Sequence, residues 1–285
     1  MDNGQLHTRE FWQSFAPGFH VADPQFFQNL TPFESTPQDF RLMADLLRVE
    51  GYVQGSNANW GVDLDAMANL VRSLTDANLS AVFAFVYDEF WLPFMRLHSV
   101  YSNLLGGQYY LLPEFWVWNV DPKRGDAGWE PHRDKDRDAL FEDGSPKSLT
   151  TWIPLSSATT MNGCMYLVPA MLDPTYGKEN ESEWEFELPS IRALPGNVGD
   201  FFIWNGAVLH WGSRTSLRAP ESRVSMAFEF QRADVAPYNE PLINPLSSLD
   251  FELRLKVIAK QILQYSHMYE LEPHIEQFAQ ELIAA

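Results

Sequence analysis

The chain has 285 residues, of which 45% are hydrophobic and 14% aromatic, enough for a substantial core. Its formal net charge of −18 argues against nucleic acid or an anionic membrane surface as a partner, because both attract basic patches. We therefore expect a small-molecule partner; the sequence does not indicate an oligomeric state. The lone Cys164 cannot form an intramolecular disulfide, and the N-terminus lacks an apolar stretch of signal-peptide length, which together predict a cytoplasmic location.

Residues 1–105 carry mainly helical signals. Asp23-Pro24 and Thr36-Pro37 each offer an N-cap followed by proline at the first helical position. After the second pair, apolar residues recur at helical spacing until Gly51, and a short strand is expected over 51–55. The apolar run "LSAVFAFVYDEFWLPFM", residues 79–95, is interrupted by charges and a proline well short of the roughly 20 residues that span a bilayer. It predicts a buried helix.

Residues 106–232 have a different texture, which predicts an all-β core. Short apolar or alternating runs are separated by Gly, Pro, Asn and Asp turns: "YYLLPEFWVWNV", "LTTWIPL", "CMYLVPA", "DFFIWNGAVLHWG" and "RVSMAFEFQ". The helical pattern returns over residues 246–285. Because neither an internal repeat nor a long linker is visible, we expect residues 1–285 to form one domain.

Three residues form a candidate metal site. If "HRD" lies on a strand, His132 and Asp134 point to the same face, and His210 follows another strand. Two histidines and one carboxylate leave three metal positions open, an arrangement that suits non-haem Fe(II) and oxygen activation. The triplet alone is a weak signal. A solvated loop for His132 and Asp134, or a core position for His210, are the alternatives.

Arg223 is the candidate anion-binding residue. It opens the apolar strand "RVSMAFEF", where a guanidinium can hold the carboxylate of a co-substrate. Arg214 and Arg218 are alternatives, but neither opens such a strand.

These motifs resemble the phytanoyl-CoA dioxygenase family of Fe(II)- and 2-oxoglutarate-dependent oxygenases. The resemblance covers residues 52–231 and rests, in order, on "WEPHRD", "TWIPLSSATTMNGCMYLVPA", "GDFFIWNGAVLHWGS" and "RVS". It implies a mostly β fold with flanking helices, built on a double-stranded β-helix or jelly-roll core. It also implies that Fe(II) is bound by the catalytic residues His132, Asp134 and His210, that Arg223 holds 2-oxoglutarate, and that O2 takes the last metal position. Asn119 and Trp152 match further co-substrate contacts of related proteins.

The substrate is less well specified. If Asn119 looks into the pocket, strand alternation places Phe115 and Val117 beside it, and Trp129 and Trp211 could stack on a ring or a cationic group. Six basic residues lie between Lys123 and Lys147, for which a solvated rim is expected and recruitment of an anionic or polar substrate is the alternative.

We predict an enzyme that hydroxylates an unactivated C–H bond of a free, polar small metabolite in specialised, natural-product biosynthesis. The same chemistry could lead to demethylation, desaturation or ring formation, or act on an acyl-CoA. A catalytically silent metabolite-binding protein, or a metal-dependent isomerase or hydrolase that uses no 2-oxoglutarate, are alternatives from other classes. Asp134 is present where the family's halogenases have a small residue, which favours oxygen insertion.

Overall fold

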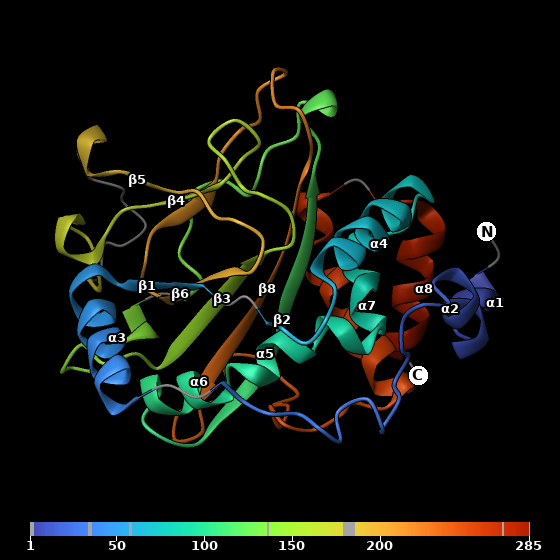
Figure 1. Ribbon diagram of the computed structural model, residues 1–285, viewed down its shortest axis with the longest axis horizontal. Helices are drawn as coiled ribbons and strands as arrows, with labels where there is room; N and C mark the ends of the chain where they lie inside the picture. Colours follow the sequence, from blue (N-terminus) through green and yellow to red (C-terminus); the bar gives the residue numbers. More distant parts are fainter. Residues whose placement is uncertain are drawn as a thin grey trace.

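The computed structural model describes residues 3–33, 36–56, 59–135, 137–178, 186–269 and 271–284, and shows two antiparallel sheets facing each other (Figure 1). The larger sheet has the order β1-β6-β3-β8-β2, and the smaller has the order β5-β4-β7. This is the expected jelly-roll with flanking helices. The strands are β1 (Tyr52–Ser56), β2 (Tyr109–Val120), β3 (Ser148–Pro154), β4 (Met165–Leu167), β5 (Arg192–Leu194), β6 (Asp200–Asn205), β7 (His210–Gly212) and β8 (Arg223–Arg232).

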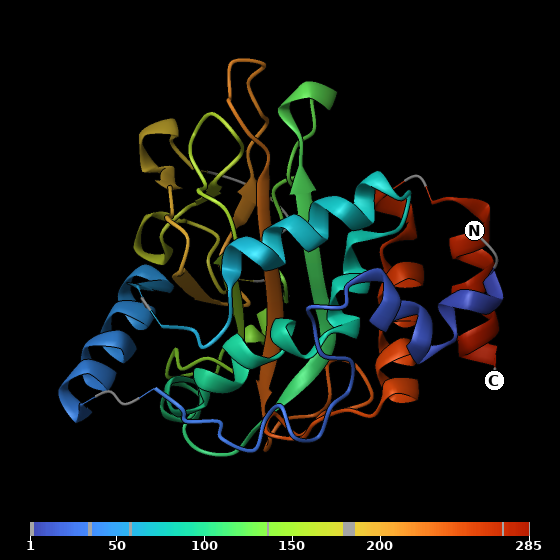
Figure 2. The ribbon, with the colours of Figure 1, turned by 45° about the vertical axis from the view of Figure 1, so that its right-hand side comes forward.

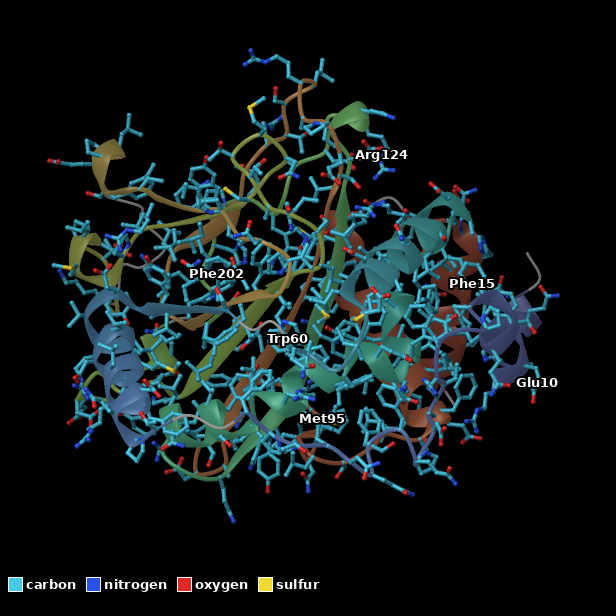
Figure 3. The ribbon with its side chains drawn as sticks, viewed as in Figure 1. Glu10, Phe15, Trp60, Met95, Arg124 and Phe202 are labelled. Atoms are coloured by element: carbon cyan, nitrogen blue, oxygen red, sulfur yellow. The ribbon has the colours of Figure 1, made fainter. Side chains whose placement is uncertain are left out.

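The larger sheet has two different faces because side chains alternate along its strands. On β8, Val224, Met226 and Phe228 belong to the large core beneath the helices, whereas Ala227 belongs to a smaller core between the sheets. Figure 3 shows Phe202 in the space between the sheets and Met95 in the helical layer. The site described below lies on the inner face.

Helices cover the outer face of the larger sheet, with α4 crossing β2 and β8 (Figure 2). The N-terminal helices α1 and α2 lie beside α8, so both chain ends are at the same end of the molecule. The α-helices are α1 (Asn3–Leu6), α2 (Arg9–Phe15), α3 (Pro37–Glu50), α4 (Leu64–Asp76), α5 (Leu92–Arg96), α6 (His98–Leu104), α7 (Phe251–Gln264) and α8 (Pro273–Ala284). Short 3-10 turns include η1 (Ala81–Val86) and η2 (Asp88–Phe90).

Two of the three helical predictions before residue 105 need correction. Thr36 caps α3 through a capping box with Asp39, and Gly51 ends that helix in the left-handed conformation, as expected. The Asp23-Pro24 pair starts no helix: Asp23 accepts a hydrogen bond from the Gln25 amide, and only turns follow. Residues 79–95 are buried but are divided into η1, η2 and α5, because Tyr87 is extended.

Within the described ranges, no helix is long and apolar enough to cross a bilayer.

Candidate metal and co-substrate site

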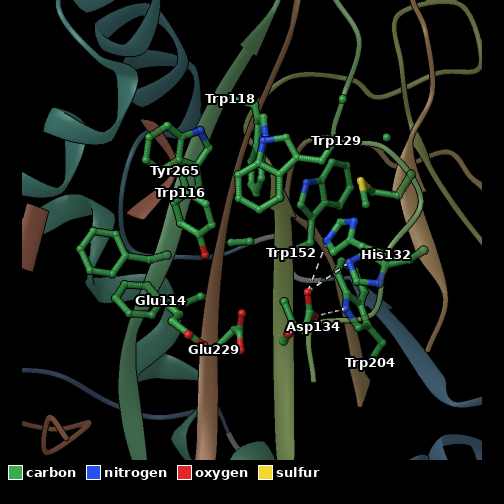
Figure 4. Close-up of a pocket in the computed structure, with 18 of the residues that line it drawn as sticks. Glu114, Trp116, Trp118, Trp129, His132, Asp134, Trp152, Trp204, Glu229 and Tyr265 are labelled. Carbon is green, nitrogen blue, oxygen red and sulfur yellow. Dashed lines mark hydrogen bonds and ion pairs between the residues drawn. The ribbon is translucent and has the colours of Figure 1, made fainter. Parts of the chain in front are cut away.

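His132, Asp134 and His210 converge on one point of the inner cavity (Figure 4). The Oδ1 atom of Asp134 lies 3.5 Å from Nε2 of each histidine, and the three ligand atoms are within 4.8 Å of one another. His132 does not lie on a regular strand as expected. Instead, its backbone pairs with that of His210 in an isolated bridge, with an N–H···O distance of 3.0 Å in each direction. This bridge, rather than strand alternation, brings the two imidazoles together.

The hydrogen bonds around the triad leave one atom of each residue for a metal. Nδ1 of His132 lies 2.7 Å from the Glu130 carbonyl oxygen, and Nδ1 of His210 lies 3.0 Å from that of Val208. Since a carbonyl can only accept, each Nδ1 carries the proton and each Nε2 is free to coordinate. Burial also lowers the pKa of His210 to about 4, which keeps its ring neutral at neutral pH.

The carboxylate of Asp134 is oriented by its other oxygen. Oδ2 accepts hydrogen bonds from Thr150 Oγ1, at 2.5 Å, and from Trp204 Nε1, at 2.9 Å. Oδ1 faces the two imidazoles. The donor set, its tautomers and its supporting hydrogen bonds therefore fit a divalent metal held by two histidines and one carboxylate.

Arg223 is a buried cation that lines the same cavity. Its side chain donates a hydrogen bond to Ser225 and lies over the Trp152 ring, with Cζ 5.7 Å from the ring centroid. No carboxylate among the described residues forms an ion pair with Arg223, and its Nε has no hydrogen-bond partner there. Burial lowers the pKa of Arg223 to about 10, so it remains charged at neutral pH. A buried guanidinium without a counter-charge is suited to an anionic ligand.

Solvent exposure separates Arg223 from the other two arginines considered for the anion site. Arg214 and Arg218, the two alternatives, are exposed to solvent. Trp152 is 1% exposed, lines the cavity, and its Nε1 has no hydrogen-bond partner in the described part of the chain. Arg223 and Trp152 thus lie together in the cavity lining, and their contact with 2-oxoglutarate stays a prediction.

Asn119, Phe115 and Val117 are placed differently from the prediction. They pair with Val224, Phe228 and Met226 of β8, on the face that packs under the helices. Nδ2 of Asn119 donates to Thr75 on α4 at 2.8 Å, and the Phe115 ring lies 4.6 Å from that of Phe85, although Phe115 also borders the cavity. These three residues share one face of β2, as strand alternation predicts, but that face packs under the helices and not on the cavity. A shift of one residue along a strand moves every side chain to the other face.

The inner face of β2 is formed by Glu114, Trp116 and Trp118, which the prediction missed. Trp129 does line the cavity: its ring lies 5.8 Å from that of His132, and its Nε1 donates to the Tyr269 hydroxyl at 2.5 Å. Trp211 follows the inward-facing His210 and is absent from the cavity lining. It stacks instead on Tyr166 and Phe186, with centroids 6.0 and 6.2 Å away.

Part of the basic cluster between Lys123 and Lys147 is not a solvated rim. Arg133 forms an ion pair with Asp173 at 2.8 Å, and both side chains are buried. Lys135 is held between Glu114 and Glu229, which both line the cavity. These two cations are occupied within the protein, which removes them from any role in attracting an anionic substrate.

A jelly-roll with two histidines and one carboxylate directed at one point defines the class of non-haem iron oxygenases. Residues 55–219 match the family model described as phytanoyl-CoA dioxygenase (PhyH), and the chain belongs to this family. No curated protein sequence matches the chain.

Several solved structures share the fold at low sequence identity. The epimerase SnoN, in complex with Fe3+, alpha ketoglutarate and nogalamycin RO, is 19% identical, with 75% of this chain and 96% of that one covered and a TM-score of 0.54. A non-heme monooxygenase, ThoJ in complex with Ni, is 14% identical, with 83% and 99% covered and a TM-score of 0.55. EctD from S. alaskensis, with 2-oxoglutarate and 5-hydroxyectoine, is 13% identical, with 78% and 92% covered and a TM-score of 0.50.

Proposed function

We propose that this protein is an Fe(II)- and 2-oxoglutarate-dependent dioxygenase that hydroxylates a C–H bond of a free, polar small metabolite in specialised biosynthesis. The observation that carries the proposal is a fully buried arginine in the cavity that also holds the triad; no carboxylate of the described residues pairs with it. Family membership supports it, and so do the solved structures of this fold whose descriptions include iron and 2-oxoglutarate. Residues 1–285 would act as one domain, since helices from both chain ends contribute to the large core.

The residues have separate roles in this proposal. His132, Asp134 and His210 hold Fe(II), which, with 2-oxoglutarate and O2, supplies the oxidising power. Arg223 and Ser225 hold the distal carboxylate of 2-oxoglutarate, and Trp152 covers it. Thr150 and Trp204 keep the Asp134 carboxylate oriented by binding its Oδ2 atom. The indoles of Trp116 and Trp129 form an apolar wall that excludes water and positions the substrate.

The nature of the cavity favours a compact substrate over an acyl-CoA. Large aromatic side chains bound the cavity, and 2-oxoglutarate would take up part of it. A coenzyme A tail also carries phosphates that need free cations, whereas Arg133 and Lys135 are bound to carboxylates. Hydroxylation is the proposed outcome because Asp134 is present as a ligand, although solved structures of this fold include an epimerase as well as monooxygenases.

The test of the metal site is the visible charge-transfer band of Fe(II) with 2-oxoglutarate in the absence of oxygen. We expect a weak band in the wild type that is lost in His132→Ala, Asp134→Ala and His210→Ala, because each residue supplies a large share of metal affinity. His267→Ala, on the exposed 3-10 turn Ser266–Met268, is the matched control. A band of unchanged strength in all three triad variants would exclude the metal site.

The substrate class is tested by coupled succinate release. Small polar metabolites should stimulate succinate formation, and acyl-CoA thioesters should not. Efficient turnover of a thioester, with none of the free compounds accepted, would contradict this part of the proposal while leaving the metal chemistry intact. A protein that binds Fe(II) and 2-oxoglutarate but forms no succinate with any compound would instead be a silent binding module.

A further inference from the structure

The cavity contains two carboxylates that the proposed chemistry does not use. Glu114 on β2 and Glu229 on β8 both line it, and each is only 9% exposed. Figure 4 shows them on the side of the cavity away from His132. Glu229 is six residues beyond Arg223 on the same face of β8, which corresponds to about 20 Å along the strand. The cavity therefore has a cationic end, where 2-oxoglutarate would bind, and an acidic end.

Among the described residues, the carboxylates at the acidic end outnumber the cations that contact them. Lys135 contacts both glutamates, with its Nζ 2.7 Å from Oε2 of Glu229, so one ammonium faces two carboxylates. Glu114 also accepts a hydrogen bond from Asn239, at 3.1 Å. The Oε2 atom of Glu229 is contacted by the ammonium that Glu229 shares with Glu114. Because Glu114 is bound by both Lys135 and Asn239, Glu229 has more acceptor capacity left for a ligand.

An aromatic cluster adjoins this acidic end. The Trp129 ring lies 4.7 Å from that of Tyr265 and 5.1 Å from that of Trp118, and Trp116 lies 5.2 Å from Tyr265. All four rings line the cavity. Burial and the negative charges of Glu229 and Glu114 raise the pKa of Tyr265, which lines the same cavity. Aromatic faces and a carboxylate are the two groups that bind organic cations in proteins.

We propose that the substrate carries a protonated amine, which binds to Glu229 against the wall of Trp116, Trp129 and Tyr265. This inference rests on the proposed function, because the formal charges of Fe(II), dianionic 2-oxoglutarate, Asp134 and Arg223 cancel. Burial and the neighbouring Glu114 raise the pKa of Glu229, so its negative charge is costly in the ligand-free protein, and a monovalent cation beside it offsets that cost. An N–H group, unlike a quaternary ammonium, can donate a hydrogen bond to the Glu229 carboxylate. Because Glu229 pairs with Thr150, which binds Asp134, the amine would lie next to the metal site.

Tryptophan fluorescence provides a binding assay independent of turnover, since five of the ten tryptophans line this cavity. The protein is loaded with Mn(II) and 2-oxoglutarate and titrated with benzylammonium, benzyl alcohol or benzoate. We expect benzylammonium to bind at least about tenfold more tightly than benzyl alcohol, and benzoate to bind least. In Glu229→Gln this preference should fall below about threefold, and Glu114→Gln should reduce it less. Glu221→Gln, at the surface, should retain it.

The outcomes separate this inference from the proposed function. Equal binding of benzylammonium and benzyl alcohol to the wild type would overturn the inference, as would an undiminished preference in Glu229→Gln. Tighter binding of a neutral polyol such as glucose would overturn it in favour of a sugar-like substrate. If Glu229→Gln does not fold, the wild-type preference and the Glu114→Gln variant still decide. Loss of the proposed function would appear elsewhere, as failure of the wild type to give the Fe(II)–2-oxoglutarate charge-transfer band.

Discussion

Replacing Arg223 with methionine should have opposite effects on stability and on co-substrate binding. Burial lowers the pKa of Arg223 from 12.5 to about 10. This shift corresponds to about 3 kcal/mol by which the folded, ligand-free protein disfavours the charged guanidinium at neutral pH. Methionine keeps most of the volume and removes that cost, but it loses the hydrogen bond to Ser225 and the contact with Trp152. We expect a net gain of about 1–3 kcal/mol.

The stability of the ligand-free protein should therefore rise, by about 2–8 °C in Tm for a chain of this size. Binding of 2-oxoglutarate should weaken at least about 30-fold, since removing one partner of a buried charge pair costs about 2–5 kcal/mol. Thermal unfolding with Mn(II), with and without 2-oxoglutarate, measures both effects in one experiment, because a ligand that binds only the folded state raises Tm. The wild type should be stabilised by 2-oxoglutarate, and Arg223→Met should not.

Arg218→Met is the matched control, because Arg218 is exposed and should affect neither quantity. The reasoning would be refuted if Arg223→Met lowered the Tm of the ligand-free protein and kept the wild-type response to 2-oxoglutarate. Arg223 would then be a structural residue.

Two further predictions concern the residues around the metal ligands and the corrected face of β2. Thr150→Val and Trp204→Phe each remove one hydrogen-bond donor to Asp134 Oδ2. Each should weaken Fe(II) binding about 10- to 100-fold, measured by titration of the charge-transfer band. An unchanged affinity in both variants would mean that Asp134 needs no such support. Asn119→Ala should leave the 2-oxoglutarate concentration required for succinate formation unchanged. It should lower the free energy of unfolding by about 1 kcal/mol, because the hydrogen bond to Thr75 is lost. A large increase in the required 2-oxoglutarate concentration would show that Asn119 contacts the co-substrate.

The triad that converges in the cavity, and the place of Arg223 in its lining, could be predicted because they depend on local motifs in a fixed order along the chain. A metal site made of two histidines and one carboxylate requires these residue types, so they can be recognised in the sequence before their positions in space are known. Their geometry could not be predicted in detail. The pairing of His132 with His210 is a single bridge between segments far apart in the sequence, and no local pattern indicates it.

The sequence does not show which face of β2 points into the cavity, because consecutive residues of the strand are apolar and no polar–apolar alternation distinguishes its two faces. Trp116, Val117 and Trp118 are all hydrophobic, and the register against β8 shifts between Leu111 and Phe115. A bulge of this kind changes which residues point inward without leaving a clear signal in composition. The sequence indicates the inner face only through the resemblance of Asn119 to a co-substrate contact. The prediction is wrong for Asn119 and Val117, whereas Phe115 packs under the helices but also borders the cavity.

A signal for the acidic end was nevertheless present in the sequence. Glu114 and Glu229 each interrupt an otherwise apolar strand, in "LLPEFWV" and "SMAFEFQ". A carboxylate at such a position is buried at considerable cost unless a cation or a ligand compensates it. Lys135 supplies one compensating charge from a segment whose many charges resemble a solvated loop. Burial and the neighbouring Glu114 raise the pKa of Glu229, and one ammonium is shared by both carboxylates. A cationic substrate group at Glu229 can therefore be tested independently of the metal chemistry.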